Sequence, residues 1–387
     1  MDNKGVLIFI CTFIPLFLLN VPAIFSQDVP EDELDVNIST YFDNFRVNVV
    51  YPSVKLTKKL GNSTSVYGRY LADIISAASM KSTFQVDGIT SATSKKVGGG
   101  DNTPDELRNE FGIGLSQKIF AGLFSLASSY SIEHDYSSKT LAVDVSYPFA
   151  KKNTELKVGF LGSFDKVFPQ IRTWTRDRNT LSFNSALTQI LGKYIIAQID
   201  GSYISSRGFQ LDGYQVVHII TGDSLHTLEP NEPDVRIRRA VGIRTNFSLS
   251  KSNTLLLGYR YYWDTWDVRS HTITTTFNRI FNKNYSISIE LRNYIQSRAY
   301  FFKPSYTQIE QYMTVDSYLN SGYSNELSLN LTINGSKKFD FPLLNNDKIQ
   351  FNGTVGFYHR YTDSPDWFSR YMHLYAYLFN IGIRYFL

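Results

Sequence analysis

Hydrophobic and polar residues alternate along most of this chain, from about residue 107 to its end. In residues 285–296 one face is apolar, and it is formed by Tyr285, Ile287, Ile289, Leu291 and Ile295. The same period of two recurs in residues 254–264 and 348–360. Such a period is typical of β-strands whose two faces meet different surroundings, so the pattern predicts a protein built almost wholly from strands.

The length of the alternating segments distinguishes between two all-β architectures. Strands of soluble sandwiches usually have about 5 or 6 residues, whereas these segments have roughly 11 to 16, enough to cross a membrane when tilted. Aromatic residues gather at segment ends, as in 259–266 and 371–379, where membrane barrels carry interfacial girdles. The sequence therefore predicts an all-β fold, a single transmembrane antiparallel up-and-down β-barrel of about 16 strands, with about 14 as the alternative.

Turn lengths predict how this barrel is oriented. Short polar turns at 151–153, 192–193, 251–253 and 282–284 alternate with longer connections near 166–178, 207–235, 299–317 and 362–370. In outer-membrane barrels the short turns face the periplasm and the long loops face outside. We therefore expect outer loops at 78–106, 207–235 and 299–317, and a weak first strand near 36–41 that makes the strand number even.

The first residues predict export. An apolar run from Val6 to Leu19 follows Asp2 and Lys4, and small residues come after it. The run is shorter than the roughly 20 residues of a membrane-spanning helix, which favours a secretory signal peptide. We expect a signal peptide at 1–26, an acidic periplasmic leader at 27–35 and the barrel at 36–387.

Composition narrows the functional classes. The chain has 387 residues, of which 15% are aromatic and 19% charged, and its net charge of +4 does not indicate a nucleic-acid partner. The only cysteine, Cys11, lies within the predicted signal peptide. The mature chain would hold no thiolate, and its histidines lack metal-ligand spacing, so we expect no metal site.

The end of the chain resembles a sorting signal. Apolar residues occupy nearly every second position from Tyr371 to Leu387, and the segment is similar to the C-terminal signal by which outer-membrane barrels are recognised. The resemblance implies the barrel-assembly machinery as a partner and the outer membrane of a Gram-negative bacterium as the location. Outer-membrane lipid would then surround the barrel.

Two stretches in the middle of the chain resemble a known family. They are YRYYWDTWDVRSHT, from Tyr259 to Thr272, and RNYIQSRAYFF, from Arg292 to Phe302. They are similar to an uncharacterised, domain-of-unknown-function family of bacterial outer-membrane β-barrels, whose signature is Y-R-Y-Y-W-D-x-W, then S-H-T, then R-x-Y-x-Q-S. The resemblance implies the fold and the location, and it implies no activity.

The alternating register also predicts charged groups in the barrel lumen. Arg260, Asp264 and Arg292 occupy lumen-facing positions of neighbouring strands. Charge-assisted hydrogen bonds among them would hold the barrel neck together, so we interpret them as a lumen charge cluster. A structural staple and a ligand or gating site at the outer mouth are both compatible with the pattern.

Residues 86–96, VDGITSATSKK, resemble a flavin attachment motif. Asp87, Thr90, Ala92 and Thr93 match the D-x-x-[ST]-G-A-[TS] sequence to which a periplasmic flavin transferase attaches FMN through a phosphoester. Ser91 stands where the motif has glycine. The resemblance implies covalent FMN on Thr93 and a flavin transferase as partner, and the alternative is a polar hairpin loop.

Three functions remain open at this point. The first is a pore or envelope scaffold of undefined solute, which is not an enzyme. The second is an extracytosolic redox component that carries FMN. The third is a surface hydrolase that uses Ser270, His271 and Asp264, although neighbouring residues of one strand point to opposite faces and cannot share a proton.

Overall fold

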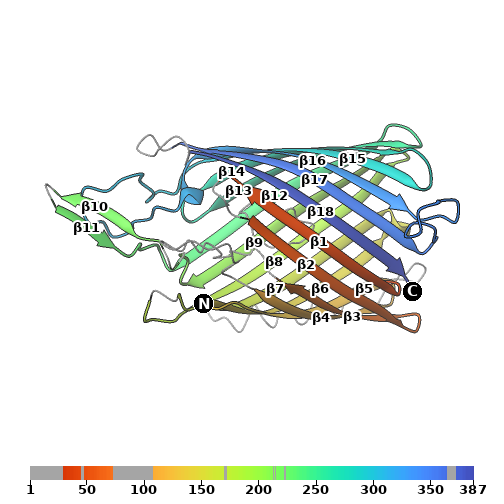
Figure 1. Ribbon diagram of the computed structural model, residues 1–387, viewed down its shortest axis with the longest axis horizontal. Coiled ribbons are helices and arrows are strands. Elements are labelled where there is room, and N and C mark those ends of the chain that lie inside the picture. Colours follow the sequence, from red (N-terminus) through yellow and green to blue (C-terminus); the bar gives the residue numbers. More distant parts are fainter. Residues whose placement is uncertain are drawn as a thin grey trace.

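The computed structural model describes residues 29–44, 48–72, 108–169, 172–211, 213, 215–221, 224–363 and 372–387. Within these residues, sixteen strands form one closed antiparallel barrel (Figure 1). The expected all-β barrel of about 16 strands is therefore confirmed. The barrel strands are β1 (Glu33–Asp43), β2 (Asn48–Leu60), β3 (Thr64–Ala72), β4 (Asn109–Ile119), β5 (Gly122–Ile132), β6 (Tyr136–Phe149), β7 (Thr154–Val167), β8 (Arg176–Gly192), β9 (Ile195–Gly208), β12 (Val235–Ser248), β13 (Asn253–Asp264), β14 (Arg269–Ile280), β15 (Tyr285–Gln296), β16 (Gly322–Asn334), β17 (Ile349–Thr362) and β18 (His373–Phe386).

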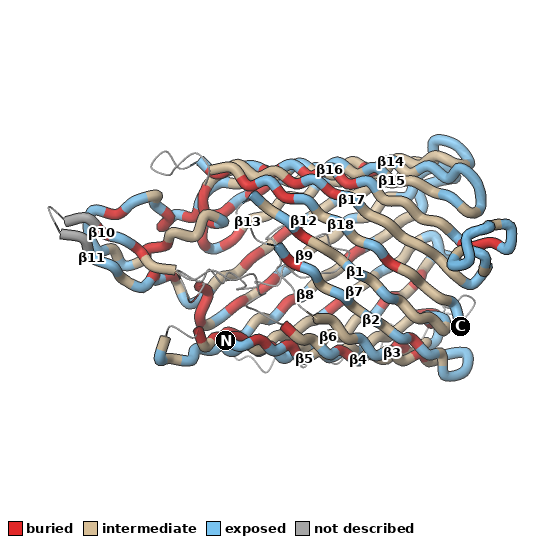
Figure 2. Tube along the Cα trace, viewed as in Figure 1, coloured by how far each residue is buried: buried red, intermediate tan, exposed pale blue. Residues whose placement is uncertain are grey.

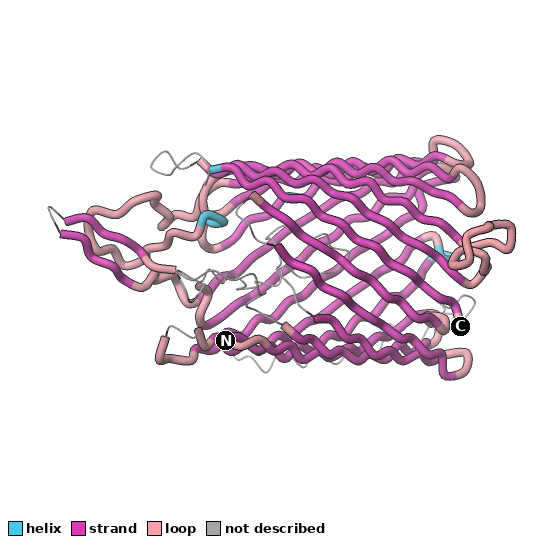
Figure 3. Tube along the Cα trace, viewed as in Figure 1, coloured by secondary structure: helices cyan, strands magenta, loops and turns pink. Residues whose placement is uncertain are grey.

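Consecutive strands are neighbours around the barrel, with one interruption. Strand β9 pairs with β12, because β10 (Val217–Thr221) and β11 (Ser224–Leu228) form a separate hairpin that projects beyond one end of the barrel (Figure 1). The other elements are two short 3-10 helices, η1 (Ala150–Lys152) and η2 (Ser317–Leu319), shown in Figure 3. No helix among the described residues is long and apolar enough to span a membrane.

The barrel closes where the two ends of the described chain meet. Strand β1 pairs with β18 along its whole length, and it begins at Glu33, three residues before the expected start of the barrel. On the lumen side of this seam, the Arg384 guanidinium lies 2.7 Å from the carboxylate of Asp35 and 3.3 Å from that of Glu33. This ion-paired contact joins the first and last strands of the barrel and so contributes to its closure.

The two faces of the wall differ as the alternating pattern predicts. Apolar side chains cover the outside, and Ile113, Phe160 and Leu181 are more than half exposed. Polar and charged side chains at the intervening positions face the lumen. A continuous apolar surface around a closed barrel fits the hydrocarbon core of a lipid bilayer. Exposing the same surface to water would be unfavourable.

Connections differ in length between the two ends of the barrel. The four expected short turns lie at the end that holds the C-terminus, and the longer connections between β9 and β12 and between β15 and β16 lie at the other end (Figure 1). We call the latter the outer end, because long loops of such barrels face outside. Each end has exceptions: residues 335–348 make a long connection at the short-turn end, and residues 265–268 make a short one at the outer end.

Many buried residues gather at the outer end rather than at the centre of the molecule (Figure 2). The two long outer connections, 209–234 and 297–321, pack against each other there. Asn231 exchanges backbone hydrogen bonds of 2.8 and 2.9 Å with Met313, and Ile219 forms a bridge with Tyr306. An apolar cluster of Val217, Ile219, Tyr306 and Met313 fills the space between the two connections.

Candidate functional site at the outer mouth

The lumen wall carries partly exposed ion pairs in its middle section. Arg260 of β13 and Arg244 of β12 both approach the Asp200 carboxylate of β9, at 3.4 and 3.8 Å. Arg260 also donates a hydrogen bond of 2.9 Å to the Ser202 hydroxyl. Gly242 leaves room for this arrangement, since a Cβ there would lie 2.9 Å from the oxygens of Asp200.

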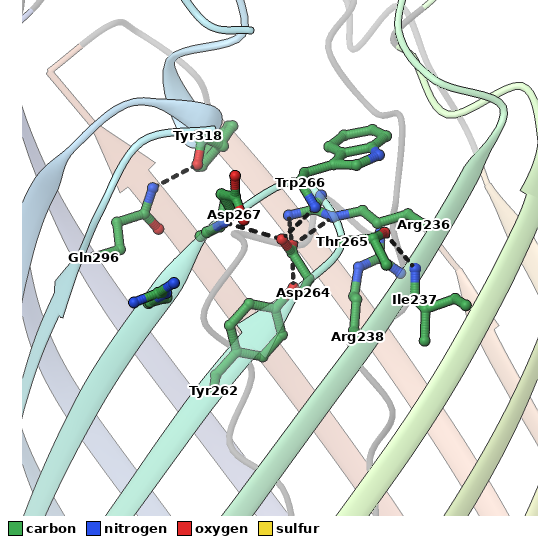
Figure 4. Close-up of polar contacts among 12 residues, drawn as sticks. Arg236, Ile237, Arg238, Tyr262, Asp264, Thr265, Trp266, Asp267, Gln296 and Tyr318 are labelled. Carbon is green, nitrogen blue, oxygen red and sulfur yellow. Dashed lines mark hydrogen bonds and ion pairs between the residues drawn. The ribbon is translucent and has the colours of Figure 1, made fainter. Parts of the chain in front are cut away.

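A buried carboxylate organises the outer mouth (Figure 4). The side chain of Asp264 has no exposed surface, and its Oδ2 accepts hydrogen bonds from Nε and Nη2 of Arg236 at 2.8 and 2.6 Å. The Tyr262 hydroxyl donates to the same oxygen at 2.7 Å. The other oxygen, Oδ1, accepts from the backbone N–H groups of Trp266 and Val268 at 2.9 and 3.0 Å. A buried charge with this many donors is stable, because both its charge and its lone pairs are compensated.

The same carboxylate shapes the short connection between β13 and β14. Both of its backbone donors lie in residues 265–268, where Asp267 adopts a positive φ of 62°. Aspartate tolerates this left-handed conformation better than most residues. The Arg236 guanidinium stacks over the Trp266 ring at 4.3 Å, and the Trp266 indole donates to the Val235 carbonyl at 3.2 Å.

Residues of the 297–321 connection pack on this corner. One buried apolar cluster joins the two segments, and it consists of Trp266, Val268, Ala299, Phe301, Phe302 and Leu319. The Gln296 amide donates to the Tyr318 carbonyl at 2.7 Å, so η2 is attached to the end of β15 (Figure 4). On its other side Arg360 of β17 stacks over the Tyr318 ring at 4.1 Å and donates to the Ser317 hydroxyl at 3.0 Å. The η2 segment therefore contacts both β15 and β17.

Two carboxyl groups lie where the two outer connections meet. Glu232 is buried, and it accepts a hydrogen bond from the Thr314 hydroxyl. Burial and, secondarily, the nearby Asp316 carboxylate raise the pKa of Glu232 to about 8. Burial also raises the pKa of Asp316, although the backbone N–H of Tyr318 donates to it at 2.9 Å. Arg236 and Arg238 face Glu232 and favour its charged form.

A second buried ion pair lies on β7 and β8, further around the same side of the barrel. Arg178 of β8 lies 2.9 Å from the Asp165 carboxylate of β7 and is almost completely buried. The hydroxyls of Ser138 and Ser163 donate to Asp165 at 2.7 and 2.6 Å. Arg178 also donates to the Tyr136 hydroxyl at 3.2 Å. These contacts hold β6, β7 and β8 together near the outer end.

The predicted lumen residues face the lumen but do not form one cluster. Arg260 and Asp264 are four residues apart on β13, which is about 13 Å along a strand, and each has other partners. Arg292 lies on β15 opposite Thr274, and its guanidinium lies over the Tyr294 ring at 5.7 Å. Asp264 is paired with Arg236, and Arg260 with Asp200.

The three residues considered for a hydrolase are not brought together. Ser270 and His271 are the second and third residues of β14, and Ser270 is buried while the His271 ring is on the outer face. The Nδ1 atom of His271 lies 2.7 Å from the Tyr259 hydroxyl. Asp264 is occupied by Arg236, so this arrangement does not provide a nucleophile with an adjacent base.

The flavin motif lies outside the described residues. This applies to Asp87, Thr90, Ala92 and Thr93, and also to the predicted signal peptide at 1–26. The structure therefore adds no geometry to the proposed attachment site.

Sequence reasoning missed Arg236, Glu232 and Asp316 as partners at the mouth. Arg236 and Arg238 alternate with apolar residues at the start of β12, and this period of two was a usable signal for their common face. Glu232 and Asp316 gave no such signal, because each lies in a connection without periodicity. Their proximity depends on how two distant connections pack.

A closed strand barrel with an apolar outside and a charged lumen defines the class: the protein is a bacterial outer-membrane β-barrel. The family model described as "Protein of unknown function (DUF3570)" matches residues 22–173 and 162–344. The chain belongs to this family, as the sequence signature implied. A comparison with curated proteins found no match.

Several solved structures are similar to this chain. A bacterial polysaccharide outer membrane secretin superposes with a TM-score of 0.51 at 8% sequence identity, covering 92% of this chain and 98% of that chain. OmpT of Vibrio cholerae has a TM-score of 0.45 at 10% identity, covering 95% and 99%. OpdK of Pseudomonas aeruginosa, solved with vanillate, has a TM-score of 0.44 at 9% identity, covering 92% and 98%. At these identities the first match supports the fold alone.

Proposed function

We propose that this protein is an outer-membrane pore with a water-filled lumen, narrowed at its outer end by residues 297–321. One observation carries the proposal: lumen-facing charged side chains keep contact with solvent. The side chains of Arg260 and Arg384 are each 39% exposed, and that of Arg244 is 31% exposed. Charged groups would be costly in a dry interior, and barrels of 16 strands are wide enough for an aqueous channel.

Conductance measurements test the proposal. Purified protein in planar bilayers should produce discrete channel events in potassium chloride. Asp200→Asn leaves Arg244 and Arg260 without their carboxylate, so we expect the chloride-to-potassium permeability ratio to rise about twofold or more. The matched control is Asp177→Asn, which removes a carboxylate that is exposed on the outer face of β8 and paired with Lys166 at 3.1 Å.

Two results would contradict parts of this proposal. An unchanged permeability ratio for Asp200→Asn, or an equal shift for Asp177→Asn, would contradict the placement of Asp200 on the conducting path. An absence of channel events above the empty-bilayer baseline would reject the pore and leave an envelope scaffold with a closed lumen.

The second candidate is a redox component that carries covalent FMN. Its support is the sequence motif of Asp87, Thr90, Ala92 and Thr93. Protein coexpressed with a periplasmic flavin transferase should gain the mass of one FMN. Thr93→Ala should remove this adduct, whereas the control Ser94→Ala, which removes the neighbouring hydroxyl outside the motif, should keep it. Intact-protein mass spectrometry measures both, and an adduct that survives in Thr93→Ala would rule the site out.

A further inference from the structure

The outer face of the barrel carries a row of cationic and aromatic side chains near its outer end. Arg239 of β12 is directly opposite Tyr203 of β9 on one side and Trp263 of β13 on the other, and Trp263 is opposite Arg269 of β14. We call Tyr203, Arg239, Trp263 and Arg269 the Arg239 row. The two arginines are two strands apart, or about 10 Å across the sheet.

The row points away from the lumen. Tyr203 is 43% exposed, and Val241 and Ile273, which continue the outer face toward the membrane interior, are also exposed. The Trp263 ring stacks on the outward Tyr261 ring with centroids 5.5 Å apart. Arg238 and Ala240 precede and follow Arg239 on β12, and both are buried on the lumen side.

The row lies at the height of the lipid headgroups. Arg269 is the first residue of β14, and Trp263 precedes the last residue of β13, so both are at the outer strand ends. Aromatic residues of membrane barrels occupy the interface between the acyl chains and the headgroups. A guanidinium at this height reaches the headgroup layer of the outer leaflet.

The arginines of the row lack carboxylate partners in the described part of the chain. No ion pair joins Arg239 or Arg269 to a described carboxylate, and Arg239 instead lies over the Tyr203 ring at 5.7 Å. By contrast, Arg236 and Arg260 on the lumen side are paired with aspartates. An unpaired cation beside the membrane is complementary to an anionic headgroup.

The strands that follow the row around the barrel, β15 to β17, present other polar groups in place of arginine. At the same height on β15, β16 and β17, the outer face presents Asn293, Asn325 and His359, which lie directly opposite one another. The Asn293 amide donates to Asn325 at 2.7 Å, so these polar groups satisfy each other. The two arginines of the row therefore have no counterpart on these three strands.

We propose that Arg239 and Arg269, flanked by Tyr203 and Trp263, bind the phosphate groups of a phosphorylated glycolipid in the outer leaflet. The planar guanidinium forms two parallel hydrogen bonds to a phosphate, which an ammonium group does not. The flanking rings hold the arginine side chains against the sheet and contact the upper part of the acyl chains.

Binding of defined lipids to the purified full chain tests this site. Native mass spectrometry in detergent would follow titration with bisphosphorylated lipid A, with its dephosphorylated form and with phosphatidylglycerol. The Arg239→Gln/Arg269→Gln variant should bind lipid A about 30-fold more weakly, because each lost cation near a headgroup weakens binding about fivefold. Retained heat-modifiable mobility in gels would show that the variant still folds.

Arg279→Gln is the matched control. Arg279 lies on the same strand as Arg269, on the same outer face and over an aromatic ring, Phe281, at 5.1 Å, but at the short-turn end. Its loss should leave lipid A binding unchanged, and Arg239→Lys/Arg269→Lys should bind more tightly than the glutamine variant. Wild-type affinity in the glutamine variant, or equal binding of dephosphorylated lipid A, would overturn the site. Equally tight, arginine-dependent binding of phosphatidylglycerol would overturn the assignment to a glycolipid.

Discussion

Two aspartates on the lumen face, Asp264 and Asp200, differ in their surroundings. Asp264 and Asp200 both face the lumen, yet the side chain of Asp264 has no exposed surface and that of Asp200 is 18% exposed. Asp264 is saturated by donors from Arg236, Tyr262 and the backbone, which suits a structural role. Asp200 shares two arginines and retains contact with the lumen, which suits a role in ion passage.

The lumen positions of Arg260, Asp264 and Arg292 could be predicted, because a period of two assigns each residue to a face. Their partners could not. Arg238 is directly opposite Asp264, but the ion pair forms with Arg236, one lumen position further out. That choice depends on the strand register and on the position of Trp266, neither of which is visible in the hydrophobic pattern.

Glu232 should make the outer mouth sensitive to pH. Its pKa is raised to about 8 in the folded protein, above an ordinary value of 4.5, so the folded state holds the proton more tightly than the unfolded one. The neutral carboxyl therefore makes its full contribution to the free energy of unfolding below about pH 4.5. This contribution is lost as the pH rises through about 8. The negative charge that forms lies beside Asp316 and among Thr314, Arg236 and Arg238, and it weakens the contact between the two outer connections.

Limited proteolysis measures this effect. Tryptic cleavage after Arg298, in the 297–321 connection, should accelerate between pH 7 and pH 9 after correction with a small trypsin substrate. In Glu232→Gln, which keeps the hydrogen-bonding shape without the charge, the corrected rate should stay constant over the same range. An identical pH profile in the wild type and in Glu232→Gln would show that another group is responsible.

Secondary-structure elements differ in how far the sequence specifies them. The long barrel strands alternate clearly, so their existence and the four short turns could be predicted from the pattern alone. The β10–β11 hairpin was expected only as part of a loop at 207–235, because its strands are short and pair outside the barrel. Its position depends on Tyr306 and Met313, which are more than eighty residues away along the chain, and such long-range pairing has no local signal.

The wall of the barrel separates two environments, lipid outside and a lumen lined by polar and charged side chains inside. The apolar outer face covers a closed set of strands, and the outer end is narrowed by two connections that pack on each other. The lumen ion pairs, the buried corner at Asp264 and the Arg239 row all follow from this division. The central claim is therefore that adjacent residues of one strand meet different solvents.

Cysteine labelling measures that claim directly, since the only cysteine of the chain, Cys11, lies within the predicted signal peptide. In a Cys11→Ser background, single cysteines would replace the neighbours Ser288 and Ile289 on β15, and Thr354 and Val355 on β17. A charged, membrane-impermeant maleimide should label the cysteines at positions 288 and 354 of the membrane-inserted protein, because those positions face a wet lumen. It should leave those at 289 and 355 unlabelled until the protein is unfolded. Equal labelling within each pair, or labelling at 289 and 355 alone, would contradict the account.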